Sequence, residues 1–236
     1  GAVFTRNAFP GAPIKVGRAL LEHEALGAVV INNKISNVCA SGGGIGDSQA
    51  VCDAVAAALS LPRRLGGQIL APEEAAVLPC STGVIGEPIP MKNLLNGVDP
   101  LVDRLSYDGA ADAANAILTT DLKVKQIAIE ASLGGRTVRI GGMAKGSGMI
   151  HPDMATMLAY ITCDVAIPLD IWTPMIKRVV NLSFNCITVD GDTSTNDSFL
   201  AFNAGDSIDK KYLAELESGL RVVCTSLAKA IARDGE

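Results

Sequence analysis

The pattern that most constrains the fold is an alternation, along the whole chain, of segments with helical spacing and short apolar segments. Apolar residues recur every three or four positions in the first kind, which predicts helices at 16–26, 48–61, 109–118, 169–181 and 210–233. The second kind predicts strands at 27–32, 75–80, 125–132, 137–142 and 157–163. Gly134 and Gly135 predict a hairpin turn between the strands at 125–132 and 137–142. Such alternation favours helices packed on sheets, so the predicted class is α/β, arranged as an α+β layered sandwich.

The composition agrees with this class. The chain has 236 residues, enough for one sizeable core or two small ones. Hydrophobic residues make up 48% and charged residues 19%, which is typical of globular rather than disordered proteins. Only 4% are aromatic, so the core must be built from Ala, Val, Ile and Leu. That composition suits α/β packing better than an aromatic-rich sandwich.

Charge and hydropathy exclude several classes of partner. The net charge is −5, and the lysines and arginines are scattered rather than gathered in a basic patch, so we expect no nucleic acid partner. No apolar run reaches the roughly 18 residues that a membrane helix needs. The first residues show no secretory signal. We therefore expect no membrane partner either.

The cysteines and histidines do not have the spacing of a metal site. No two cysteines form a CxxC pair, and His23 and His151 show no ligand spacing with them, so we expect no structural zinc. Isolated cysteines on apolar segments are more often reduced core residues, which indicates a reducing compartment. The six cysteines are Cys39, Cys52, Cys80, Cys163, Cys186 and Cys224.

Three segments resemble ligand-binding loops but fail at a required position. The glycines at 42–46 follow a strand and precede a helix, yet Asp47 stands where a dinucleotide loop needs its third glycine. The sequence Lys-Gly-Ser at 145–147 reverses the order of a phosphate-binding loop. A calcium loop beginning at Asp190 would need glycine where Thr195 stands. No GxSxG motif of a serine hydrolase occurs.

The segment KGSGMIHPDMATML at 145–158 contains a candidate catalytic residue. It places Lys145 on a glycine-rich turn and the small residue Ala155 directly before Thr156. A threonine hydroxyl becomes a good nucleophile when the chain is cut just before it, because the freed α-amine, with a pKa near ~8, acts as its base. We therefore predict self-cleavage at Ala155–Thr156 with Thr156 as nucleophile. The alternative on spacing alone is a strand that begins at Thr156.

Four segments together resemble the ornithine acetyltransferase family, also called the bifunctional acetyltransferases of arginine biosynthesis. They are STGVIGEPIP at 81–90, AILTTD at 116–121, KGSGMIHPDMATML at 145–158 and TVDGDTSTND at 188–197, in the family's order and separation. The resemblance covers nearly the whole chain, while family members extend beyond both of its ends. It implies a fragment truncated at both ends. The asparagine-rich segment 31–39 fits the family pattern only loosely.

The resemblance also implies roles for particular residues. Thr82 and Gly83 would form the oxyanion site, for which a hydroxyl and a glycine-turn N–H are suitable donors. Without the resemblance, the residues themselves favour a tight turn with a hydroxyl–backbone hydrogen bond. Thr119 (or, as an alternative, Thr120) and Lys145 would contact substrate, and a lone lysine is otherwise usually solvated. Glu236 would receive the amino group of ornithine.

Two further features near the predicted nucleophile are open to a structural interpretation. His151 invites a role as a base, but the freed amine already supplies one. The segment 190–197 is dense in Asp, Ser, Thr and Asn, which form side chain–backbone turns. We interpret it as a shaped turn that supports the site rather than as part of the chemistry.

The implied activity is acetyl transfer from N-acetylornithine to glutamate through an acetyl-threonine on Thr156. This ping-pong reaction needs no cofactor, although acetyl-CoA is a donor for some members. The fragments 1–155 and 156–236 would stay together as one structural domain region and pair into a homo-oligomer of heterodimers. The compartment would be the cytoplasm in a bacterium, and the plastid or mitochondrial matrix in a eukaryote. The alternatives are a self-processed aminopeptidase-like hydrolase and an unprocessed, inactive fragment.

Overall fold

The computed structural model describes residues 1–21, 26–60, 76–151 and 157–235 and divides the chain into two compact units. One unit comprises Gly1–Asn7 and Thr120–Glu236, and the other comprises Ala8–Thr119. By sequence, the predicted cleavage bond between Ala155 and Thr156 falls within the first unit. The two predicted fragments would therefore share that unit. That they act as one domain region stays a prediction.

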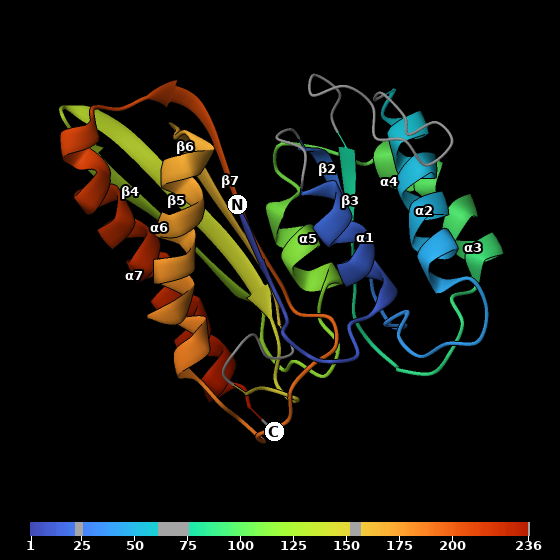
Figure 1. Cartoon of the computed structure of the whole chain (residues 1–236). Helices are drawn as coiled ribbons and strands as arrows, with labels where there is room; N and C mark the ends of the chain where they lie inside the picture. Colours follow the sequence, from blue (N-terminus) through green and yellow to red (C-terminus); the bar gives the residue numbers. More distant parts are fainter. Residues whose placement is uncertain (22–25, 61–75, 152–156, 236) are drawn as a thin grey trace. The chain divides into compact units, whose positions relative to one another are not determined.

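The first unit is built on a five-stranded sheet (Figure 1). Its strands, in spatial order, are β1 (Ala2–Phe4), β7 (Ser198–Ser207), β6 (Leu158–Ala166), β5 (Arg136–Lys145) and β4 (Lys125–Leu133). The β6–β7 pair is parallel and the other pairs are antiparallel. The predicted hairpin between β4 and β5 is confirmed, and Gly134 and Gly135 both have the positive φ that its two-residue turn requires.

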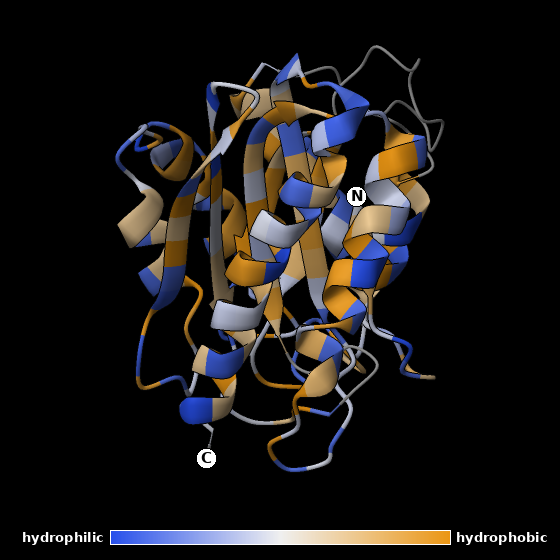
Figure 2. Cartoon of the chain, turned by 90° about the vertical axis from the view of Figure 1, so that its left-hand side faces the viewer, coloured by the Kyte–Doolittle hydropathy of each residue, from blue (hydrophilic) through white to orange (hydrophobic). Residues whose placement is uncertain are grey.

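Two amphipathic helices of this unit pack against the sheet and against each other, α6 (Leu169–Asn181) and α7 (Leu213–Arg233). Both carry hydrophobic and hydrophilic residues on different sides (Figure 2). In α6 the buried residues recur at helical spacing, which orients one stripe towards the core; they are Trp172, Met175, Ile176, Val179 and Val180. The indole N–H of the fully buried Trp172 donates to the Ala201 carbonyl at 3.1 Å, so its one polar group is satisfied.

The second unit holds a parallel pair of strands, β2 (Leu26–Asn32) and β3 (Ala76–Ser81). Their register pairs Asn32 with Ser81, so the carboxyl ends of the two strands meet at one edge. The helices α1 (Ala12–Leu20) and α2 (Gly44–Ala58) contact β3 and each other. The described part of the unit also contains three short helices, α3 (Met91–Asn96), α4 (Val98–Val102) and α5 (Ala110–Ala116).

The predicted α/β class is confirmed, and each predicted helix and strand has a counterpart in the structure. Several boundaries are wrong. Helix α1 begins at Ala12 rather than at 16, because Pro13 suits a first turn. Helix α2 begins at Gly44 rather than at 48, within the glycine segment 42–46. The segment 210–212 before α7 is a 3-10 turn.

Some elements were not predicted at all, because their local patterns are weak. They are β1, β7, α3, α4 and the 3-10 turn Phe184–Cys186. Strand β7 is fully buried only in its first half and exposed at its end, so it has no steady alternation. The six cysteines are all free thiols, and Cys52, Cys80, Cys163 and Cys224 are buried as expected, whereas Cys39 and Cys186 are exposed.

Candidate active site

Lys145 is the last residue of β5 and is almost completely buried, with 2% of its surface exposed. Both the expected loop position and the alternative of a solvated lysine are therefore wrong. The sequence did not reveal this because the strand continues through Gly141 and Gly142, which weaken a strand pattern. Burial lowers the pKa of Lys145, while Asp121 and Asp197 favour its charged form.

The turn after Lys145 is tied to the end of the AILTTD segment. The backbone N–H of Gly146 donates to Asp121 Oδ1 at 2.6 Å. The hydroxyl groups of Thr120 and Ser147 lie 2.7 Å apart and share a hydrogen bond. Gly146 has a φ of +146°, a conformation that favours glycine. Two of the sequence segments, 25 residues or more apart along the chain, thus meet at Lys145.

A buried cluster of charged side chains holds Asp121, the residue that binds this turn. Lys125 Nζ lies 2.6 Å from Asp121 Oδ1 and 2.6 Å from Asp234 Oδ2, and all three side chains are nearly inaccessible. Asp234 also accepts the N–H groups of Leu122 and Lys123. Burial tends to raise the pKa of Asp234, but the hydrogen bonds from Lys125 and from Lys123 N–H bring it below its usual range. The cluster was not predicted.

The strand register brings Lys145 close to the segment that follows the predicted cleavage bond. Lys145 pairs with Leu158 of β6, and Leu158 pairs with Ser198 of β7. These three residues therefore form a row across neighbouring strands at one end of the sheet. Ala155 and Thr156 themselves lie outside the described residues, as does Glu236, so their predicted roles stay predictions.

Asp197 lies at the same end of the sheet and is completely buried. Its Oδ1 accepts the backbone N–H of Met157 at 2.9 Å. Burial raises the pKa of Asp197 to about 8, against the opposing effects of the Met157 N–H, the Ser194 and Thr5 side chains and the charge of Lys145. The sequence marked this segment as a turn but did not indicate that one of its carboxyl groups would be buried.

The rest of the polar 188–197 segment behaves as the predicted shaped turn. The Asp190 carboxylate accepts the N–H groups of Met149 and of Ile150, the latter at 2.8 Å, and also that of Asp192. These bonds attach the segment to the loop before the predicted cleavage bond. His151 is exposed, and its Nδ1 lies 3.4 Å from Thr188 Oγ1.

Thr82 and Gly83 lie in the unit Ala8–Thr119, directly after the carboxyl end of β3. Thr82 is buried, and its N–H donates to the Asn32 carbonyl at 3.0 Å. Gly83 has a φ of +127°, and a Cβ there would lie 2.1 Å from the carbonyl carbon of Lys34. Only glycine fits this turn, in which no described residue accepts a hydrogen bond from the Gly83 N–H.

Thr119 is half-buried and ends the same unit. The segment before it is fixed by Asn33, whose Nδ2 donates to the carbonyls of Ala116 and Leu118 at 2.8 and 2.7 Å. Asn33 belongs to the asparagine-rich segment, so that segment positions the polypeptide just before Thr119. Each predicted residue of this unit thus follows β3 or α5, and Lys145 lies in the other unit.

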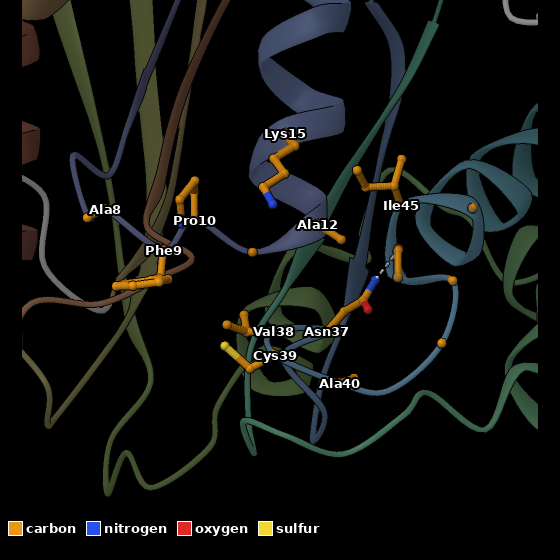
Figure 3. Close-up of a pocket in the computed structure, with 15 residues that line it drawn as sticks. Ala8, Phe9, Pro10, Ala12, Lys15, Asn37, Val38, Cys39, Ala40 and Ile45 are labelled. Carbon is orange, nitrogen blue, oxygen red and sulfur yellow. Dashed lines mark hydrogen bonds between the residues drawn. The ribbon is translucent and has the colours of Figure 1, made fainter.

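A cavity of about 750 Å³ also lies within this unit (Figure 3). Its walls come from the start of α1, including Lys15, and from the glycine-rich segment that leads into α2. Asn37 points across it, with its Nδ2 bonded to Ser48 Oγ at 2.9 Å and to the Gly44 carbonyl at 2.8 Å. None of the predicted site residues that the structure describes lines this cavity.

Comparison with known proteins identifies the family to which these motifs belong. The family model described as the ArgJ family matches residues 1–236. The chain belongs to the ArgJ family. The arginine biosynthesis bifunctional protein ArgJ of Prochlorococcus marinus is 58% identical over 209 residues, which cover 89% of this chain and 48% of that protein. That of a Synechococcus species is 46% identical and covers all of this chain and 56% of its own length.

Solved structures agree with this membership. The ArgJ structure from Bacillus halodurans matches with a TM-score of 0.54 and 35% identity, over 66% of this chain and 75% of that one. Ornithine acetyltransferase from Mycobacterium tuberculosis, complexed with ornithine, matches with a TM-score of 0.53 and 39% identity, over 64% and 75%. This ArgJ family chain spans about half the length of the curated relatives it matches.

The described residues also bear on two other kinds of site. In the four described ranges, no helix is both long and apolar enough to cross a membrane. Among those same residues, no group of three or more His, Cys, Asp or Glu side chains is arranged to hold a metal ion.

Proposed function

We propose that the full-length protein transfers an acetyl group from N-acetylornithine to glutamate in arginine biosynthesis, by way of an acetyl ester on Thr156. The observation that carries this proposal is the ArgJ family match over residues 1–236. It is supported by relatives named arginine biosynthesis bifunctional protein ArgJ and by a solved relative complexed with ornithine. Self-cleavage between Ala155 and Thr156 would expose the α-amine of the nucleophile.

The transfer proceeds in two balanced half-reactions. In the first, the Thr156 hydroxyl attacks the acetyl carbonyl, the bond to the ornithine nitrogen breaks, and the hydroxyl proton passes through the α-amine to the departing ornithine. In the second, the amine of glutamate attacks the acetyl ester, and its proton returns to the Thr156 oxygen. No cofactor is required for either step, and acetyl-CoA could replace N-acetylornithine as the donor.

Each half-reaction develops negative charge on the acetyl oxygen. We assign its stabilisation to the Thr82 hydroxyl and the Gly83 N–H, since the Thr82 N–H is already bonded to Asn32. Lys145 would pair with a substrate carboxylate, and its burial in a poorly hydrated environment would strengthen that attraction. Thr119 and Glu236 would complete the substrate contacts, with Glu236 receiving the amino group of ornithine.

The proposal extends to the assembly and its location. The fragments 1–155 and 156–236 would remain associated and pair further into a homo-oligomer of heterodimers. The relatives named above come from cyanobacteria and other bacteria, which favours the cytoplasm over the plastid or mitochondrial alternatives. The scattered charges of the chain are consistent with small-molecule substrates rather than nucleic acid.

Label transfer tests the proposal. The purified full-length protein is incubated with N-acetylornithine labelled in the acetyl group, with and without glutamate, and the products are separated. We expect labelled N-acetylglutamate only when glutamate is present, and no transfer by Thr156→Ala. Labelled acetate formed equally with and without glutamate would instead establish the aminopeptidase-like hydrolase, in which water is the acceptor. A full-length protein that transfers no label would contradict the proposed function.

A further inference from the structure

Directly before Ser198, in the row of residues at the end of the sheet, lies one acidic group that the proposed chemistry does not use. Asp197 is 0% exposed, and it precedes β7 by one residue. Its Oδ1 holds the N–H of Met157, while the Met157 carbonyl accepts the N–H of Ser198 at 3.2 Å. Both backbone groups of Met157 are therefore bound to Asp197 and its neighbour. By sequence, Met157 follows the predicted nucleophile directly.

The second oxygen of this carboxyl group is the more unusual feature. Asp197 Oδ2 is buried and accepts no hydrogen bond of good geometry from the described part of the chain, although the Ser194 and Thr5 side chains lie near enough to favour the ionised carboxylate. A buried polar atom without a partner costs free energy, so such atoms are uncommon unless they serve a purpose. Among the described residues, Lys145 is the charged group that lowers the pKa of Asp197. Asp121 and Lys125 in turn influence the pKa of Lys145. A buried acid therefore stands next to a buried lysine where β6 begins.

We propose that Asp197 is a positioning residue for self-cleavage, whose carboxyl group fixes Met157 and thereby the chain immediately after the predicted cleavage bond. This inference rests on the proposed function. The protonation state of Asp197 affects its hydrogen bond with the Met157 N–H, because a carboxylate accepts a stronger hydrogen bond than a neutral carboxyl group. The pKa of Asp197 is raised to about 8, so the group is protonated below that pH and ionised above it. Met157 is thus held more strongly above pH 8 than below it.

The test separates the hydrogen bond from the charge. The full-length protein is made by cell-free synthesis, diluted into buffers from about pH 6 to about pH 9.5, and its self-cleavage is followed over time. We compare wild type with Asp197→Asn, which keeps an oxygen acceptor but cannot ionise, and Asp197→Ala, which keeps neither. Asp192→Asn is the matched control, since Asp192 is an exposed acid of the same segment. Thermal melting confirms that each variant folds.

We expect wild-type cleavage to accelerate as the pH rises through 8. Asp197→Asn should cleave without that increase, Asp197→Ala should be slower by about 10-fold or more at every pH, and Asp192→Asn should match wild type. Hydrogen exchange at Met157 should be faster in Asp197→Ala than in Asp192→Asn. A merely structural role would lower the melting temperature but leave the shape of the pH profile unchanged.

Two outcomes would overturn the inference, and they differ from failure of the proposed function. If Asp197→Ala cleaves like wild type, or if Asp197→Asn keeps the increase through pH 8, Asp197 does not position the cleavage site. If the wild-type protein itself remains uncut while Met157 exchange still responds to Asp197→Ala, the hydrogen bond is real and the proposed function has failed. The role of Asp197 in cleavage then fails with it.

Discussion

Among the glycines that the structure describes, Gly83 has the least room for a Cβ atom. Its turn combines a φ of +127° with a backbone contact that any Cβ would violate, since Lys34 O would lie 2.2 Å away. The close approach arises because the chain after β3 runs beside the chain after β2, with Val84 N–H bonded to the Lys34 carbonyl at 2.9 Å. The turn in which the Gly83 N–H has no acceptor among the described residues therefore also requires glycine.

Gly83→Ala should destabilise the protein by about 2–3 kcal/mol, because the clash is with backbone and cannot be relieved by a side-chain rotation. Gly86→Ala is the matched control: Gly86 also has a positive φ, of +90°, but nothing lies within 4 Å of its Cβ position. It should cost about 1 kcal/mol from backbone strain alone. Urea unfolding measures both. Equal losses in the two variants would show that the Lys34 contact does not constrain this turn.

At the scale of secondary-structure elements, Lys125 connects three parts of the first unit. It lies at the start of β4, and its ammonium joins Asp121, in the segment before that strand, to Asp234 at the end of α7. Asp121 in turn holds Gly146, the residue after Lys145. The cluster therefore positions the end of β5, where the predicted substrate lysine lies.

Lys125→Met should destabilise the protein by about 3 kcal/mol or more, since it leaves two buried carboxylates without their shared cation. The exposed Lys123→Met is the control and should change little. The effect has a pH signature. Folding lowers the pKa of Asp234. The contribution of the ionised Asp234 to the free energy of unfolding is therefore present above its unfolded pKa of about 4 and is lost as the pH falls through the folded value.

The difference in the free energy of unfolding between wild type and Lys125→Met should therefore shrink on acidification. Chemical denaturation at neutral pH and at low pH measures it. A difference that is constant across this range, or a Lys125→Met protein as stable as Lys123→Met, would mean that the cluster contributes nothing through its charges.

The sequence predicted elements whose patterns are local and missed contacts that are not. The β4–β5 hairpin and α6 follow from two glycines and one apolar stripe, so both were found. The contact between Lys125 and Asp234 joins residues 109 positions apart, and no local pattern indicates it. The same holds for Asp197: its motif showed a turn, but only the packing of β6 and β7 reveals that its carboxyl group is buried.

At the scale of the whole molecule, the predicted cleavage divides the five-stranded sheet between two chains. Strands β1, β5 and β4 precede the bond, and β7 and β6 follow it, while the spatial order is β1-β7-β6-β5-β4. Each strand of the second fragment therefore pairs with one strand of the first, through β1–β7 and β5–β6. Cutting one peptide bond would leave these ladders and the shared apolar core intact, which explains how the fragments could remain together.

The most direct test of this account is the intact mass of the purified full-length protein, measured after native size-exclusion chromatography. We predict two masses in a single peak, with the second polypeptide beginning at Thr156. Thr156→Ala should give one uncut mass in the same assay. A wild-type protein with one mass, or with a cut at any bond other than Ala155–Thr156, would contradict the assignment of Thr156 as an N-terminal nucleophile.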